Sequence, residues 1–189
     1  MRTAVILLLL VGASGSATDA VRSRDAEIRA ALPPDGQALT EAGRQKIEGI
    51  VSRIVDTRAI LESALEKRWT QMTEVQRRRL REAFEHRFRV SGTAHLDTWR
   101  KTRIDYLPEE RKGDLVRVPT RIAAEGEESD VTYVLRDGAA GWRIVDIVVD
   151  DVSTVENYRA SFARVISREG VEALIDRLNR GADAKRKKE

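Results

Sequence analysis

The spacing of apolar residues changes twice along this chain, and this change constrains its fold more than any other feature. Between residues 40 and 92, apolar side chains recur every three or four positions, which is typical of helices with one buried stripe. Between residues 116 and 149 the spacing of two typical of strands appears, and after residue 153 the helical spacing returns. Strands enclosed by helices on both sides predict an α+β domain built on an antiparallel sheet.

We expect about four strands in this sheet. Three of them are predicted at residues 102–107, 116–122 and 131–135. Pro119 favours an edge position or a bulge for its strand, because proline cannot donate a backbone hydrogen bond. The fourth, residues 142–149, is apolar on both faces, which predicts a central strand covered by one apolar layer on each side.

About six or seven helices are expected to wrap the sheet. Thr73 and Ser153 each stand three residues before Gln or Glu, the pattern of a capping box that opens a helix. A short helix is expected at residues 25–32, and Gly170 should interrupt the C-terminal helical segment.

The N-terminus resembles a secretory signal peptide covering residues 1–17. Arg2 precedes an apolar run too short to span a bilayer, and small residues follow up to Ala17. The mature chain would then comprise an N-terminal extension with a short helix at 18–39, one domain at 40–181, and a basic disordered tail at 182–189. Because the sequence contains no cysteine for a disulfide or a lipid anchor, we expect a freely diffusing exported protein.

Composition and motifs argue against several classes of protein. The 34 Lys and Arg residues are interleaved with 31 Asp and Glu residues, which favours a solvated surface over a nucleic-acid interface. His86 and His95 do not have the spacing of a metal-binding pair on one helix face, and no glycine-rich phosphate loop is present. We therefore expect no enzyme activity, no metal and no cofactor.

Asp146 leaves an alternative open, because it interrupts an otherwise apolar strand. Its side chain faces the edge of the sheet, forms hydrogen bonds with backbone groups, or has a functional role. One rival hypothesis is an enzyme of the ketosteroid-isomerase and nuclear-transport-factor type with Asp146 as pocket base. Another is a non-catalytic adaptor of the envelope. Asp146, Asp150 and Asp151 together have fewer and more widely spaced oxygen ligands than calcium loops usually offer.

Residues 141–162 closely resemble the hallmark of the MlaC family. The shared pattern begins with Gly-Trp, carries an Asp within the strand, and continues through Val-Ser to Asn-Tyr-Arg and a helical Phe. Residues 65–77 and 166–178 resemble two further family segments, so the similarity covers about residues 40–180. The chain departs from the family pattern at Glu66, Val145, Asp150, Asp151 and Ser161, which indicates a divergent member.

The resemblance implies a function and a set of partners. Members of this family are periplasmic phospholipid-binding components of the Mla intermembrane transport system, also known as toluene-tolerance auxiliary components. By that resemblance the chain would be a monomeric carrier of glycerophospholipid that maintains the lipid asymmetry of the outer membrane. It would exchange cargo with an inner-membrane ABC transporter complex and an outer-membrane lipoprotein complex, with transient contact to the membrane surface and none to nucleic acid.

The resemblance also implies a twisted antiparallel sheet wrapped by helices, related to the NTF2-like architecture, with an apolar lipid pocket between the layers. Our hypothesis for the wall of that pocket combines apolar strand residues with residues from the helix that follows. The predicted lipid-binding residues are Val116, Val118, Ile122, Val131, Tyr133, Leu135, Trp142, Ile144, Val148, Tyr158, Phe162 and Val165. Tyr158 and Arg159 are candidates to meet the head group at the pocket mouth.

Overall fold

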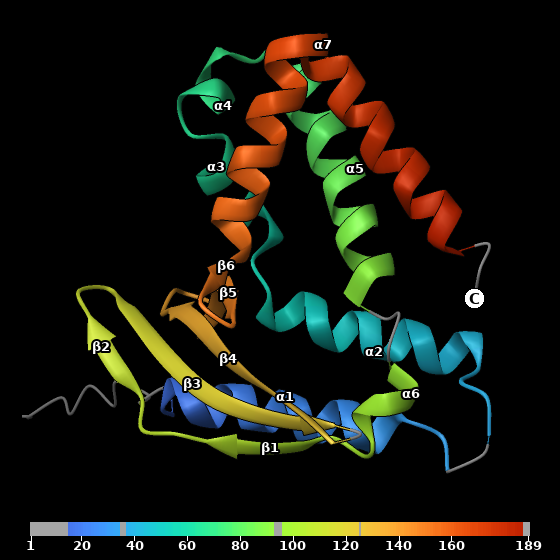
Figure 1. Cartoon of the computed structure of the whole chain (residues 1–189), viewed down its shortest axis with the longest axis vertical. Helices are drawn as coiled ribbons and strands as arrows, with labels where there is room; N and C mark the ends of the chain where they lie inside the picture. The colour runs from blue at the N-terminus through green and yellow to red at the C-terminus, as the bar shows by residue number, and fades with distance from the viewer. Residues whose placement is uncertain (1–14, 35–36, 93–95, 125, 187–189) are drawn as a thin grey trace, which may run out of the picture.

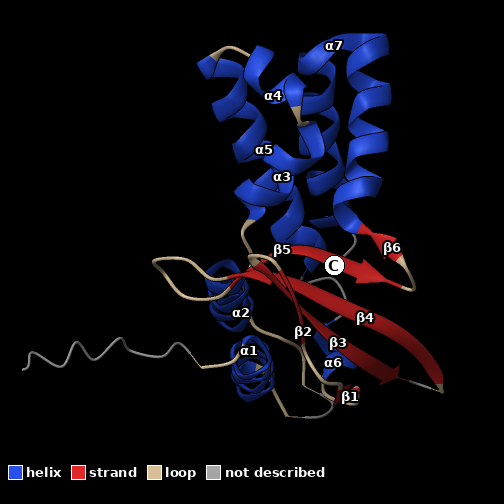
Figure 2. Cartoon of the chain, turned by 90° about the vertical axis from the view of Figure 1, so that its left-hand side faces the viewer, coloured by secondary structure: helices blue, strands red, loops and turns tan. Residues whose placement is uncertain are grey.

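A computed structural model describes residues 15–34, 37–92, 96–124 and 126–186. The described chain has two layers, a helical bundle and, beneath it, an antiparallel sheet with further helices (Figures 1 and 2). The bundle contains α3 (Thr57–Leu65), α4 (Lys67–Gln71), α5 (Glu74–Gly92) and α7 (Thr154–Arg186). The lower layer adds α1 (Ala17–Ala31), α2 (Glu41–Ile54) and the short α6 (Leu96–Trp99). This confirms the predicted α+β class.

The sheet has six strands, where the alternation of the sequence predicted about four. They are β1 (Arg103–Tyr106), β2 (Glu110–Lys112), β3 (Leu115–Ala124), β4 (Glu127–Arg136), β5 (Arg143–Val149) and β6 (Val152–Ser153). The order is β1-β3-β4-β5-β6, with β2 also paired to β3, and every pair is antiparallel. The two strands that the sequence analysis missed, β2 and β6, are too short to show a period.

Two strand positions differ from the prediction. β5 is not central, since only the two-residue β6 lies beyond it. β3 is not an edge strand, although it contains Pro119. Pro119 lies on β3 between the stretch that pairs with β1 and the stretch that pairs with β2, and its carbonyl accepts a hydrogen bond from Leu107 N at 2.9 Å. Proline has no backbone N–H group to donate, and Pro119 lies where the pairing of β3 changes from β2 to β1, so no hydrogen bond of a ladder is lost there.

A bulge in β5 changes which of its side chains share a face. Val134 pairs with Asp146, whereas the next residue, Leu135, pairs with Ile144, so Val145 has no partner in the register. Because side chains alternate along a strand, the extra residue shifts the alternation by one position. Ile144 and Ile147 consequently face the same side of the sheet.

The helices begin where local capping predicts. Thr73 N donates to Gln76 Oε1 at 3.1 Å, and Gln76 N donates to Thr73 Oγ1 at 3.2 Å, which confirms the first capping box. α1 is longer than the predicted helix at 25–32, because Ser16 Oγ accepts from Asp19 N and starts it at Ala17. Residues 1–14 of the expected signal peptide lie outside the described residues.

α7 shows the predicted interruption. Gly170 has φ 85° and ψ 175°, outside the helical region, so two helical segments meet there at a kink. The helix continues to Arg186 and buries Ala182 completely. The chain is thus helical beyond residue 181, where a disordered tail was expected to begin, and residues 187–189 lie outside the described residues.

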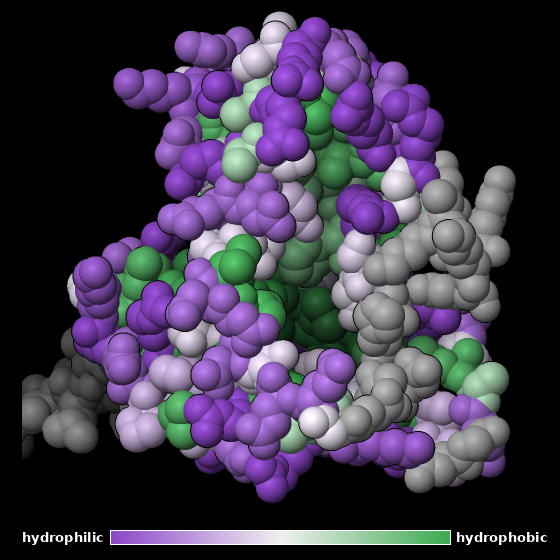
Figure 3. All heavy atoms as spheres, in the orientation of Figure 1, coloured by the Kyte–Doolittle hydropathy of each residue, from purple (hydrophilic) through white to green (hydrophobic). Residues whose placement is uncertain are grey.

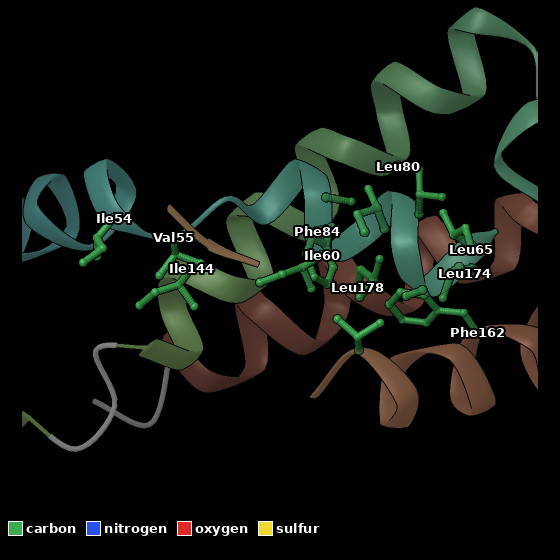
Figure 4. Packing of buried hydrophobic residues seen from close by; sticks show 14 of the residues in the cluster. Ile54, Val55, Ile60, Leu65, Leu80, Phe84, Ile144, Phe162, Leu174 and Leu178 are labelled. Carbon is green, nitrogen blue, oxygen red and sulfur yellow. The ribbon is translucent and has the colours of Figure 1, made fainter. Parts of the chain in front are cut away.

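Aromatic side chains fill the centre of the bundle. The Phe84 ring of α5 is fully buried and lies 5.1 Å from the Tyr158 ring and 6.0 Å from the Phe162 ring of α7, edge to face in both pairs. Phe162 points toward residues of α3, α5 and α7, well away from Ile144 of the sheet (Figure 4). The bundle core and the buried sheet residues belong to one continuous hydrophobic cluster, and Phe162 lies at its bundle end.

Asp146 anchors the start of α7. Its carboxylate accepts from Ser153 Oγ at 2.6 Å, Val155 N at 3.0 Å and Ile147 N at 2.8 Å. Ser153 Oγ in turn accepts from Glu156 N at 3.1 Å, the bond that the second capping box predicts. The carboxylate therefore fastens the first turn of α7 to the sheet.

We expect Asp146→Asn to lower the free energy of unfolding by about 1–3 kcal/mol, because an amide oxygen replaces only part of this acceptor set and leaves partners unsatisfied. Urea denaturation measures the change. Asp151→Asn is the matched control, since Asp151 is exposed and its left-handed backbone suits asparagine equally well. Equal losses in the two variants would contradict the anchoring role.

Candidate functional site

An apolar cavity of about 310 Å³ lies between one face of the sheet and the helices that cover it. Seen from the side of Figure 1, hydrophobic residues lie at the bottom of a hollow between the bundle and the elements below it (Figure 3). The cavity is lined from α1, α2, α5, α6, β1, β3, β4 and β5, by Val21, Arg24, Asp25, Ile28, Val51, Ile54, Val55, Phe88, Gly92, Leu96, Trp99, Ile104, Tyr106, Ile122, Val131, Tyr133, Ile144 and Ile147. The volume is at the lower end of the range for sites that take small molecules.

Cross-strand pairing builds the sheet side of this cavity. Ile104 of β1 pairs with Ile122 of β3, and Ile147 of β5 pairs with Tyr133 of β4, so these four side chains lie on one face. Ile144 joins them because of the bulge in β5. The register thus gathers apolar side chains from four strands opposite α1 and α2.

The predicted wall residues divide into three groups. Ile122, Val131, Tyr133 and Ile144 line the apolar cavity. A second group, Val116, Val118 and Leu135, is almost fully buried on the same sheet face but is not part of the lining. Trp142, Val148, Tyr158, Phe162 and Val165 are placed elsewhere and are also outside the lining.

The residues of the third group have separate structural roles. Val148 pairs with Thr132 on the opposite face of the sheet, because the bulge reverses the alternation that we assumed. Trp142 Nε1 donates to Gly15 O at 2.6 Å. Tyr158 and Phe162 stack at 5.1 Å inside the bundle, and Arg159 pairs with Glu66, so neither Tyr158 nor Arg159 is at the mouth of this cavity.

Much of the lining comes from segments that the sequence analysis did not assign to the site. α1 contributes Val21 and Ile28, and α2 contributes Val51 and Ile54. Their helical apolar spacing was visible in the sequence, but this spacing shows only that a helix face is buried. It does not show against which strand the face packs.

Two tyrosine side chains bring hydroxyl groups to a mostly apolar lining. Burial raises the pKa of Tyr106 to about 12, with Asp25 adding to the effect and Arg22 and Arg29 opposing it. Burial also raises the pKa of Tyr133, assisted by Tyr106 and Asp25. The Tyr106 hydroxyl is buried without a hydrogen-bond partner among the described residues. It is a donor available to an acceptor inside the cavity.

These shifts predict a pH dependence at alkaline pH. A raised pKa means that the folded chain retains the phenolic proton more strongly than the unfolded chain, so the stabilisation is complete below the ordinary pKa of 10. It is lost as pH rises through the folded value of about 12 for Tyr106. Ultraviolet difference absorbance should therefore show less phenolate in the folded protein than in the denatured protein near pH 10, and identical titration curves would contradict this burial.

A polar cavity of about 560 Å³ adjoins the apolar one. Val51, Val55, Phe88 and Gly92 line both cavities and form the boundary that the two cavities share. The remaining lining is mostly polar and charged, with Gln45, Glu48, Gly49, Ser52, Asp56, Thr57, Arg58, Glu85, Arg89 and Arg143. An apolar and a polar compartment side by side suit an amphipathic ligand.

Asp146 does not occupy the position expected of a pocket base in either cavity. Asp146 lines neither of the two cavities, and its oxygens are engaged by the start of α7. Among the described residues, no group of three His, Cys, Asp or Glu side chains is placed to hold a metal ion. Within that same part of the chain, no helix has the length and hydropathy needed to cross a membrane.

Together these features define an α+β protein in which helices cover one sheet face and leave an apolar cavity beside a polar one. Within this class the chain belongs to the MlaC family: the family described as "MlaC protein" matches residues 30–180. This confirms the resemblance seen in the sequence.

A solved structure shares the fold. It is described as the phospholipid-binding protein from Ralstonia solanacearum in complex with a phospholipid. The TM-score is 0.74 at 23% identity, over 90% of this chain and 99% of the other. No curated protein matches the sequence.

Proposed function

We propose that this protein is a periplasmic carrier of glycerophospholipids that acts in an Mla-type ABC transport system. The observation that carries the proposal is the apolar cavity of about 310 Å³ between the sheet face and α1, α2 and α5. Membership of the MlaC family supports it, as does the shared fold with a protein solved in complex with a phospholipid.

The energetics of the cavity suit a carrier. Burial of one methylene group stabilises a complex by about 0.8 kcal/mol. The return of a buried acyl chain from the cavity to water is therefore strongly unfavourable. Release then requires a second apolar environment. The proposed donor and acceptor are an outer-membrane lipoprotein complex and an inner-membrane ABC transporter complex, each visited by a monomeric carrier without a cofactor.

The proposed signal peptide supports a location in the periplasm. The apolar run from Ala4 to Val11 and the small residues after it have the composition of a cleaved export signal. N-terminal sequencing of the protein recovered from a periplasmic extract tests this step, and an intact Met1 in that fraction would contradict it.

A transfer assay tests the carrier function. Delipidated mature protein is incubated with vesicles of labelled glycerophospholipid, separated from them, and mixed with unlabelled acceptor vesicles. We expect labelled lipid to leave with the protein and then to appear in the acceptor vesicles in proportion to the amount of protein. Transfer no greater than that of a buffer blank would refute the proposal.

A further inference from the structure

The polar cavity next to the apolar one has charged groups of both signs. Three guanidinium groups and three carboxylates line it, from Arg58, Arg89, Arg143, Glu48, Asp56 and Glu85. A cavity that only shields acyl chains from water needs apolar side chains and no charged ones. The charged groups therefore indicate which polar groups of a ligand this cavity can bind.

Arg143 supplies a positive charge that forms no ion pair with a carboxylate of the described residues. Its Nη2 donates to Ser52 O at 3.2 Å and to Val55 O at 2.8 Å, at the C-terminal end of α2. Carbonyl groups at a helix C-terminus stabilise a cation without cancelling its charge. The Arg143 Nε group is buried and has no acceptor among the described residues. Arg143 is therefore held in place and able to attract an anion.

Two carboxylates supply the opposite charge. Glu48 lies on α2 and Glu85 on α5, and both side chains are partly buried in the lining of the polar cavity. Neither forms a hydrogen bond or an ion pair within the part of the chain that the structure describes. Partly buried carboxylates without a partner favour the approach of a cation.

Asp56 and Arg58 are already engaged. Asp56 Oδ1 accepts from Ala59 N at 2.9 Å and caps α3, while Arg58 Nε donates to Glu62 at 2.7 Å. Arg89, the third guanidinium group, is exposed and has an interaction of its own. The groups on which the assignment of a ligand rests are thus the Arg143 cation and the Glu48 and Glu85 anions. A ligand with both charges would satisfy both sets.

We propose that the polar cavity binds the head group of a zwitterionic glycerophospholipid, with the phosphate toward Arg143 and the ammonium toward Glu48 and Glu85. This deepens the proposed function and rests on it, because the acyl chains would occupy the adjoining apolar cavity. The shared wall of Val51, Val55, Phe88 and Gly92 places the glycerol region of such a lipid between the two compartments.

The test is a competition between two head groups. Delipidated mature protein is incubated with vesicles of equimolar phosphatidylethanolamine and phosphatidylglycerol that carry the same acyl chains, and the bound lipids are quantified by mass spectrometry. We expect wild type to take up phosphatidylethanolamine over phosphatidylglycerol by about threefold, the preference of partly exposed charge pairs. The double variant Glu48→Gln/Glu85→Gln should reduce this ratio to about one.

Glu82→Gln is the matched control, because Glu82 is an exposed residue of α5 outside the lining of both cavities. It should keep the ratio of wild type. Lipid uptake at the vesicle ratio by wild type, or an unchanged ratio in the double variant, would overturn the head-group assignment and leave the carrier function intact. Absence of any lipid uptake would reject both the head-group assignment and the carrier function. The total amount of bound lipid distinguishes this outcome from a failure of the head-group assignment alone.

Discussion

Ile147→Arg is expected to abolish phospholipid binding while the protein stays folded. Ile147 lines the apolar cavity and is only partly buried, so the arginine stem can occupy the cavity while its guanidinium reaches water. Loss of contact with even three or four methylene groups corresponds to about 2–3 kcal/mol, or a decrease in affinity of roughly 50-fold or more. Mass spectrometry of extracted lipid measures the loss, and circular dichroism monitors the fold.

The neighbouring residue provides the matched control. Val148 is also partly buried, but it pairs with Thr132 on the opposite face of the sheet and lines neither cavity. Val148→Arg should therefore retain wild-type amounts of lipid. If Val148→Arg lost lipid and Ile147→Arg kept it, the bulge at Val145 would not determine which residues of β5 face the cavity.

Phe84→Ala is expected to cause the largest loss of stability. The ring is fully buried and contacts Phe88, Tyr158 and Phe162 at centroid distances of 6.1, 5.1 and 6.0 Å. Truncation of such a side chain leaves a cavity between α5 and α7 and costs about 3–5 kcal/mol. Urea denaturation of delipidated protein measures the change without the contribution of a bound ligand.

Val75→Ala on the same helix is the control, since Val75 is 53% exposed. Its free energy of unfolding should change by less than about 0.5 kcal/mol. A similarly small effect for Phe84→Ala would show that the bundle does not pack around the aromatic cluster.

Features encoded locally could be predicted from the sequence. The capping box at Thr73 and the kink at Gly170 depend on a few neighbouring residues, and both are present in the structure. The class of the fold followed from two apolar periods that persist over long segments. Short strands such as β6 left no such signal, because two residues do not define a period.

The position of β5 could not be predicted because it depends on partners remote in sequence. Its continuous apolar run predicted a central strand, yet only the short β6 lies beyond β5, and its helical neighbours are α2, α3 and α7. The bulge at Val145 is a property of the pairing with β4 and changes the face of every later residue in the strand. This is why Ile147, and not Val148, lines the cavity.

In the candidate site, too, locally encoded features could be predicted and features that depend on tertiary packing could not. Ile122, Val131 and Tyr133 could be assigned to one face by alternation alone, and the structure places all three in the lining. Phe162 could not be distinguished from them by hydrophobicity, although it packs in the bundle. Phe162→Arg would therefore disrupt the core and is unsuitable as a test of lipid binding.

Native mass spectrometry of the mature protein purified from a periplasmic extract tests the central claim most directly. The carrier function predicts that the protein has the mass of the polypeptide plus one glycerophospholipid, and that tandem fragmentation releases the lipid. A protein with the mass of the bare polypeptide, which also gains no lipid after incubation with phospholipid vesicles, would contradict the claim.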